Sequence, residues 1–524
     1  MRAAVHRERL RNRWAQAGVF LLPLAPASML LCVSGCMVGP NYSRPSTTMS
    51  EAYHELPATP EATTPAPADD ASTSEIRWWR RFDDTELTSL VERAVAVNNG
   101  IKVAQARVRQ ARAARQVAQS LLYPQVGVGA SVLRFRISQG VVQLPGASLE
   151  DNLFQVGFDA SWVVDLFGGT RRLVESARAT EQGVDAQRRG IVLIIAAETA
   201  RAYMELRGAQ RQLEVANATL EEQRQTLVVT EEKRKNGLAS DLEVVRARTE
   251  VEATAADIPP IEQAIRQYIH VLSTLLALEP TALSDELSAP SALPPAPTQL
   301  AAGVPSDLLR RRPDIQAAER ELAAATAQVG VATAQLFPKV VLGATGGLAS
   351  RNFDDLFNAN STQTPSSYYL AGPSINWTIF DAGRRKATIK ASEAEVDAAK
   401  ASYSDTVLGA FREVESALVG VDRARARVAD LKQLSASARE AVNIAQRDYR
   451  NGLLDQLTVL DAQRQSSRAD MLLAQGEVVL AVDMVTLYKA LGGGWEMAEP
   501  PPASPSEGTQ PTAPTSVSAH EDKG

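Results

Sequence analysis

The sequence predicts an α+β membrane protein in which short amphipathic strands alternate with very long helices. Three observations lead to this fold class. The chain carries two copies of one unit, each copy holds two strands of alternating polarity, and each copy holds a long helical hairpin. Aromatic residues make up only 5% of the 524 residues, which favours long alanine-rich helices over many packed layers.

The duplication is visible as four landmarks that recur in the same order at offsets of 213 to 215 residues. The matched positions are Tyr123 with Phe337, Leu166 with Ile379, Asn236 with Asn451, and Ala277 with Ala490. A period this long is not that of a solenoid, so each copy is a whole structural unit. We expect the first copy over residues 75–280 and the second over residues 281–495.

Each copy is predicted to contribute two strands, at about 125–137 and 153–165 in the first copy and at about 339–349 and 368–380 in the second. Polar or small residues alternate with apolar ones along them. In the second strand the apolar positions are Phe154, Val156, Phe158, Ala160, Trp162 and Val164. Strands of about ten residues cross a bilayer when tilted, so we expect the apolar face to meet lipid.

Two tryptophans occupy equivalent places near strand ends, Trp162 and Trp377. Aromatic residues gather at membrane–water interfaces, so these two are predicted interface residues. The competing interpretation is a soluble hairpin with one face packed on a core. It requires a cover for that face, and the neighbouring segments are charged helices.

The helical hairpins are predicted at about 170–278 and 383–491. Residues 172–235 contain no proline and would form a helix on the order of 95 Å long at about 1.5 Å per residue. Its narrow alanine-rich stripe suits a coiled-coil-like wall rather than a globular core. Pro259-Pro260 is expected to break the first return helix, with a kink or an unwound turn there. A soluble coiled-coil rod would explain these helices but leaves the strands unexplained.

Four strands cannot close a barrel, and open sheet edges are not tolerated in hydrocarbon. The smallest membrane barrels have about 8 strands, so closure requires at least a second copy of the chain. Two copies would give a nearly filled interior, whereas three would leave room for a pore. We therefore expect a homo-oligomer.

The N-terminus has the layout of a secretory leader over residues 1–35: a basic region, an apolar stretch and small residues before Cys36. Val33-Ser34-Gly35-Cys36 resembles a bacterial lipobox, which would make Cys36 the lipid-modified first residue of the mature chain. The alternative is a single inner-membrane helix. After the leader we find no unbroken apolar run long enough to span a membrane. Residues 36–74 are predicted to be the lipidated N-terminus and a linker, and 496–524 a disordered tail.

Several functional classes are disfavoured by composition. The net charge of -6 argues against nucleic acid as a partner. The four histidines lie far apart, which argues against a metal site or a serine hydrolase; they are His6, His54, His270 and His520. We expect no cofactor, no metal and no enzymatic activity.

Several motifs resemble those of bacterial outer membrane efflux proteins. Arg311-Arg312-Pro313-Asp314-Ile315, followed by Gln316 to Glu321 and then by Leu336-Phe337-Pro338, is similar to that family's signature stretch. The run from Cys36 to Tyr42 resembles the mature N-terminus of its lipoprotein branch, the TolC-like factors of the NodT/OprM type. Leu457 to Ala462 is similar to the family's second helical tip. From the residues alone, Arg311 to Ile315 is a helix start with Pro313 in the first turn.

The resemblance implies a homotrimer with a 12-stranded barrel in the outer membrane and a helical tunnel in the periplasm. It implies a lipid-anchored exit duct for drugs or other small molecules. The implied partners are outer membrane lipid, a periplasmic adaptor protein and an inner-membrane transporter of the RND type. A duct for protein export, as in type I secretion, and a non-conducting structural periplasmic lipoprotein remain alternatives.

The resemblance also implies roles for residues at the hairpin tips. Leu457 and Asp461 match the family's constriction, and Tyr449 and Asp455 are candidates for holding it closed. The turns expected to meet the adaptor are Asn236, Gly237 and Leu238 in the first hairpin and Asn451, Gly452 and Leu453 in the second.

Overall fold

The computed structural model describes residues 37–46, 52–55, 77–136, 138, 150–297, 305–357 and 366–496, with the side chains of 305–307 excepted. The predicted leader, Cys36 and the predicted C-terminal tail after residue 496 lie outside the described residues. The chain divides into two compact units. Unit 1 comprises residues up to Tyr53, Lys102–Arg188 and Val304–Glu413, and unit 2 comprises His54–Ile101, Arg189–Gly303 and the rest from Val414.

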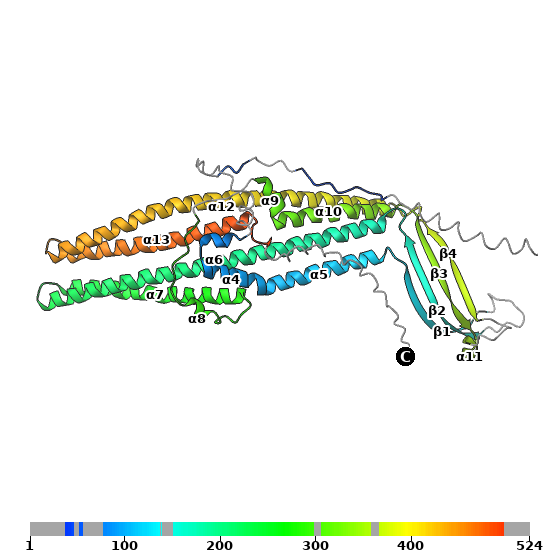
Figure 1. The fold of residues 1–524 in the computed structure, drawn as a ribbon, viewed down its shortest axis with the longest axis horizontal. Coiled ribbons are helices and arrows are strands. Elements are labelled where there is room, and N and C mark those ends of the chain that lie inside the picture. Colours follow the sequence, from blue (N-terminus) through cyan, green and yellow to red (C-terminus); the bar gives the residue numbers. More distant parts are fainter. Residues whose placement is uncertain are drawn as a thin grey trace, which may run out of the picture. The chain divides into compact units, whose positions relative to one another are not determined.

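The elements follow one another in the order that the duplication predicts (Figure 1). In the first copy they are η3 (Trp78–Phe82), α4 (Thr85–Val97), α5 (Asn99–Ser120), β1 (Gln125–Arg136), β2 (Glu150–Val164), α6 (Gly169–Lys235) and α7 (Asp241–Leu275). In the second they are α8 (Ser284–Leu287), α9 (Pro305–Arg311), α10 (Pro313–Ala334), β3 (Lys339–Ser350), α11 (Phe353–Leu356), β4 (Ser367–Asn376), α12 (Arg384–Arg450) and α13 (Gln456–Ala490).

Unit 1 holds one antiparallel sheet in the order β1-β2-β3-β4 (Figure 1). The register sets polar and small residues of neighbouring strands opposite one another, as in Gly129 with Gly157 and Gly157 with Gly347. On the other face the apolar side chains are exposed: Val126, Val128 and Phe158 are 70%, 72% and 62% accessible. Among the described residues, Phe353 of α11 packs on Phe154 at one end of this face, but the three side chains just named stay in solvent, which argues against the soluble hairpin with a packed core.

Helix α10 begins at Pro313, as the sequence predicts. Proline fits the first helical turn because its missing N–H would be unpaired there in any case. Arg312, just before it, is 7% exposed and donates hydrogen bonds to Asp314 (2.7 Å) and to Glu413 of α12 (2.8 Å). The motif therefore starts a helix and ties it to a second one.

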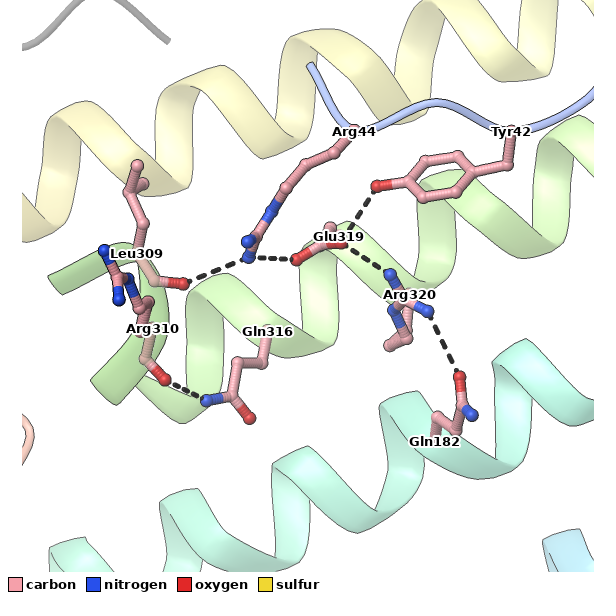
Figure 2. Close-up of polar contacts among 8 residues, drawn as sticks. All are labelled: Tyr42, Arg44, Gln182, Leu309, Arg310, Gln316, Glu319 and Arg320. Carbon is pink, nitrogen blue, oxygen red and sulfur yellow. Dashed lines mark hydrogen bonds and ion pairs between the residues drawn. The ribbon is translucent and has the colours of Figure 1, made fainter. Parts of the chain in front are cut away.

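The segment Met37–Ser46, predicted as part of the N-terminal linker, packs on α6 through Val38 and on α10 through Tyr42 and Arg44. Figure 2 shows the contacts with α10. Tyr42 donates a hydrogen bond of 3.0 Å to Glu319, and Arg44 lies 2.6 Å from the same carboxylate. Burial alone would raise the pKa of Glu319, but hydrogen bonds from Arg320 and Tyr42 outweigh it and hold that pKa below its ordinary value. Burial and the neighbouring Glu319 raise the pKa of Tyr42 to about 12.

The core of unit 2 contains an aromatic cluster that joins the start of the chain's first copy to α13. Trp78 stacks on Tyr488 with ring centroids 5.3 Å apart, and Trp79 and Phe82 meet the Trp78 ring edge-on. Among the described helices, α13 alone is long and apolar enough to cross a membrane by length and composition. The sequence did not predict this, because Glu477 and Asp483 interrupt the apolar run of α13; the helix is partly buried within the chain, at residues such as Met484, Val485 and Leu487.

Helix α7 continues through Pro259 and Pro260, whereas the sequence predicted a break there. Each proline removes one donor and leaves the carbonyl four residues earlier, on Ala255 or Ala256, without its helical partner. All four residues are exposed, so water can solvate the freed carbonyls and the helix is not forced to end.

Exchange of both prolines for alanine should therefore strengthen α7. Each replacement restores a backbone donor, and the intrinsic preference for helix improves by up to about 3 kcal/mol per residue. We expect slower amide hydrogen exchange across residues 252–263 in Pro259→Ala/Pro260→Ala than in the wild type. Pro290→Ala, in a described loop, is the control, and equal exchange in the double variant would contradict the expectation.

Candidate functional site: hairpin tips and sheet

The two hairpins of unit 2 turn by the same backbone motif. Helix α6 ends before Gly237, whose φ of 73° is in the left-handed region, and the Leu238 N–H donates to the Lys233 carbonyl (2.8 Å). Gly452, with φ of 72°, and Leu453 repeat this geometry after α12. Glycine is favoured at this position because it has no Cβ, and the closing hydrogen bonds satisfy the last helical carbonyls. Asn236 and Asn451 immediately precede the two glycines.

The turns leave leucine side chains in solvent at both tips. Leu238 is 76% exposed and Leu453 is 72% exposed. A compact motif that places an apolar side chain in water at an equivalent position in each copy is typical of a contact surface rather than of core packing.

Each return helix begins with a side-chain cap. Ser240 and Glu243 form a reciprocal capping box at the start of α7. At the start of α13, Asp455 accepts hydrogen bonds from the Thr458 N–H (2.9 Å) and hydroxyl (2.6 Å). Hydrogen bonds from the hydroxyl and then the N–H of Thr458 lower the pKa of Asp455. Within the chain, Asp455 is thus the cap of α13.

Leu457 and Asp461 lie on one exposed face of α13. They are four residues apart, so their side chains are neighbours along the helix. Leu457 is 48% exposed, and the Asp461 carboxylate accepts a hydrogen bond of 2.7 Å from Gln465. The opposite face carries buried residues such as Gln456 and Val459.

Tyr449 links the two hairpins near their tips. The Lys233 Nζ on α6 lies 3.4 Å from the centroid of the Tyr449 ring on α12. A cation over an aromatic face is attracted by the ring quadrupole, and the contribution at an exposed site is about 0.5–1 kcal/mol. Tyr449 is a residue that the sequence predicts, whereas Lys233 is not, because nothing in the linear sequence pairs positions so far apart.

A buried polar seam between α6 and α13 was also missed. Its contacts run from Gln456 to Thr230 (2.6 Å), from Gln463 to Thr226 (3.0 Å) and from Thr219 to Ser467 (3.2 Å). The spacing of seven residues between Gln456 and Gln463 matches the repeat of a coiled coil. This spacing is the feature of the sequence from which the seam could have been predicted.

A cavity of about 320 Å³ adjoins this seam and is lined by side chains of α6, α12 and α13. Its wall includes Glu222 and Asp470, and the Arg439 guanidinium lies 3.0 Å from Asp470. Burial and the nearby Asp470 raise the pKa of Glu222. Among the described residues there is no group of three His, Cys, Asp or Glu side chains placed to hold a metal ion.

The two tryptophans of unit 1 make equivalent contacts at the strand ends. Trp162 Nε1 donates to the Leu122 carbonyl and Trp377 Nε1 to the Leu336 carbonyl, each at 3.0 Å. Trp377 follows β4 directly and is 56% exposed. Each indole N–H thus pairs with a backbone carbonyl in the turn that leads from a helix into a strand, and the indole ring lies on the apolar side of the sheet.

Duplicated helical hairpins joined to a sheet with an uncovered apolar face define an outer membrane channel protein. The chain belongs to the outer membrane efflux protein family, whose model matches residues 90–277 and 304–493. It is an outer membrane efflux channel.

The chain is similar to named members of this family. It is 34% identical to the pyoverdine export outer membrane protein OpmQ of Pseudomonas putida over 432 residues, which are 81% of this chain and 89% of the relative. It is 32% identical to nodulation protein T of Rhizobium leguminosarum bv. viciae over 485 residues, 92% of this chain and 95% of the relative. The solved outer-membrane channel OprN superposes with a TM-score of 0.79 at 36% identity, over 88% of this chain and 100% of that one.

The cap at Asp455 generates a prediction. Asp455→Ala should fray the first turn of α13 and speed amide exchange across residues 456–460, whereas Asp455→Asn should retain most of the protection. Because the folded-state pKa of Asp455 is lowered, the ionised cap stabilises the tip above the ordinary carboxyl pKa of about 3.9 and the effect is lost as the pH falls further.

Ser240→Ala is the matched control, since it removes the cap of the other return helix. It should speed exchange at the start of α7 and leave α13 unchanged. Equal protection of α13 in Asp455→Ala and the wild type would rule out the capping role.

Proposed function

We propose that three copies of this chain form the passive exit duct of a tripartite efflux pump for drugs or other small molecules. The three sheets would close a 12-stranded barrel in the outer membrane, and the hairpins would form a tunnel in the periplasm. The energy would come from an inner-membrane transporter of the RND type, joined to the duct by a periplasmic adaptor protein.

The observation that carries this proposal is the open, uncovered sheet. Strands β1 and β4 each keep one edge unpaired within the described chain. Backbone N–H and C=O groups at such an edge cannot be left unpaired in hydrocarbon, so further strands must come from other copies. Tyr369 and Ile375 of β4 are 90% and 70% exposed, which suits contact with lipid.

The polar face of the sheet supports a conducting assembly of three copies. Six glycines lie on it in register: Gly127, Gly129, Gly157, Gly343, Gly347 and Gly372. A Cβ added at Gly129, Gly343 or Gly372 would meet no atom within 4 Å. A face without side chains at these points would leave the interior of a 12-stranded barrel free for solute.

The tips support the contact with an adaptor. The turns at Asn236-Gly237-Leu238 and Asn451-Gly452-Leu453 present equivalent exposed leucines on hydrogen-bonded glycine turns. We assign them as the adaptor contacts. We assign Leu457, Asp461, Tyr449 and Asp455 to the periplasmic gate, with Tyr449 acting through its contact with Lys233 and Asp455 through the start of α13.

We further propose that Cys36 carries the lipid that anchors the mature chain in the outer membrane. The lipobox supports this assignment, and so do the hydrogen bonds from Arg172 that hold Val38, Gly39 and Asn41, the residues just after it, against α6. We assign Trp162 and Trp377 to the membrane interface on the periplasmic side, because both lie where strands join the tunnel helices.

The test of the proposed duct uses purified full-length protein in planar bilayers. We expect a trimer by mass in detergent and discrete ion-conducting steps after insertion. A monomeric or non-conducting protein would contradict the proposal and favour a structural lipoprotein. Drug accumulation in cells that lack the gene, with and without complementation, separates a small-molecule duct from a protein export duct.

The gate assignment gives a separate prediction. Leu457→Ala and Asp461→Ala should each raise single-channel conductance, because they remove an apolar ring and a ring of charge from the proposed constriction. Val245→Ala, an exposed apolar position on α7, serves as the control. Conductance that stays at the wild-type value in both gate variants would remove these residues from the constriction.

A further inference from the structure

Glu319 is a buried carboxylate in the signature stretch of α10 that the proposed duct does not use. It is 6% exposed and is surrounded by donors (Figure 2). Tyr42 donates to it at 3.0 Å, Arg44 at 2.6 Å, and Arg320 from the same helix. Arg44 reaches the Leu309 carbonyl as well (3.3 Å). Two of the three donors to this carboxylate therefore belong to the N-terminal segment.

Arg320 completes this end of the contact. Its guanidinium lies over the Tyr42 ring, 5.4 Å from the centroid, and donates to Gln182 of α6 at 3.2 Å. The side chain thus spans from α10 to α6 and forms a surface on which the tyrosine ring rests (Figure 2).

Arg172 of α6 also binds the N-terminal segment, at a point nearer the sheet. It is 1% exposed, and its guanidinium donates to the Val38 carbonyl (3.1 Å), the Gly39 carbonyl (3.3 Å) and the Asn41 side chain (2.7 Å). Glu175 lies 2.7 Å from it and balances its charge. One buried cation therefore contacts three residues of the N-terminal segment.

The backbones approach closely between these two contacts. A Cβ on Gly39 would lie 2.5 Å from the Gly330 Cα, and a Cβ on Gly330 would lie 2.8 Å from the Arg172 Cδ. Gly39 also has a φ of 89°, in the left-handed region. Two glycines that leave no room for any side chain make this fit specific to one path of the chain.

We propose that α6 and α10 form a dock for the segment Met37–Arg44, and that the dock holds the lipid-bearing N-terminus beside the end of the sheet. The signature stretch of α10 then has a role beyond starting a helix: it supplies Glu319. This inference rests on the proposed lipid anchor at Cys36.

Two buried charged side chains of the dock depend on the segment for hydrogen bonds. Without the segment, Glu319 would lose two donors and Arg172 three acceptors, and both side chains are buried. Leaving a buried charge with unmade hydrogen bonds is strongly unfavourable, so an empty dock would be a liability to the fold.

The position of the dock explains its use. The Val38 N–H donates to the Phe167 carbonyl (3.2 Å), and Met37 packs against Gly168, between the end of β2 and the start of α6. Consecutive Cα atoms are about 3.8 Å apart, so a lipid on Cys36 would leave the protein close to the end of β2. Acyl chains would then enter the bilayer next to the barrel wall.

The test measures the mobility of a spin label at Ser43, an exposed residue of the docked segment, in the full-length trimer in lipid nanodiscs. Glu319→Gln removes the charge that Arg44 and Tyr42 bind. We expect the ratio of docked to free segment to fall roughly tenfold or more, the size of a lost charge-assisted hydrogen bond. Glu321→Gln, an exposed acid two residues further along α10, is the matched control and should leave the spectrum unchanged.

Gly39→Val is the second variant, because it alters the segment and leaves α6 and α10 intact. It should free the label as Glu319→Gln does, while a label at Gln328 on α10 should keep its wild-type spectrum in both variants. An immobile Ser43 label in Glu319→Gln and Gly39→Val would overturn the dock.

Two further measurements on the same samples separate this outcome from failure of the proposed function. The mass of the mature N-terminal peptide reports whether Cys36 carries acyl chains, and bilayer conductance reports whether the trimer is a duct. A conducting, acylated protein whose segment stays immobile in both variants would refute the dock alone. An unmodified Cys36 would refute the anchor on which it rests.

Discussion

The structure depends on one constraint, the need to pair every backbone donor and acceptor that lies in hydrocarbon. A four-stranded antiparallel sheet leaves two open edges, and most apolar side chains on its outer face, such as Val126, Val128 and Phe158, are exposed. Water would tolerate the edges but not that face, whereas lipid tolerates the face but not the edges. Only association with further copies satisfies both requirements, so the quaternary structure is a consequence of the strand count.

The helices are subject to a different constraint, because they lie in water rather than in lipid. A narrow apolar stripe is sufficient there for pairing, and the remaining surface must be polar. Seams in unit 2 accordingly mix buried aliphatic residues with hydroxyl and amide contacts, such as those of Thr226 with Gln463 and Thr230 with Gln456. Hydrogen bonds of this kind contribute only about 1 kcal/mol each relative to water, so the wall is held by many small terms rather than by a large core.

The fold class followed from the sequence because its signals are local and repeated. Period-two polarity around Phe154 to Val164 and the proline-free run before Asn236 each report on neighbours in the chain. The side-chain contacts of the candidate site could not be predicted from the sequence, because they join residues that are far apart in the chain. Lys233 meets Tyr449, and Glu319 meets Tyr42, across separations that no periodicity encodes. The break expected at Pro259 is absent because solvent accepts the freed carbonyls, and exposure is a tertiary property.

The duplication has an electrostatic consequence at the tips. With the offset of 215 residues that relates Gly237 to Gly452, Leu457 corresponds to Leu242, and Asp461 to Arg246. Leu242 and Arg246 are exposed like their counterparts. Divergence of the two copies has thus kept the aliphatic residue while reversing the formal charge beside it. At this position each chain therefore carries a positive charge on one return helix and a negative charge on the other, so a ring of such chains would alternate in sign there.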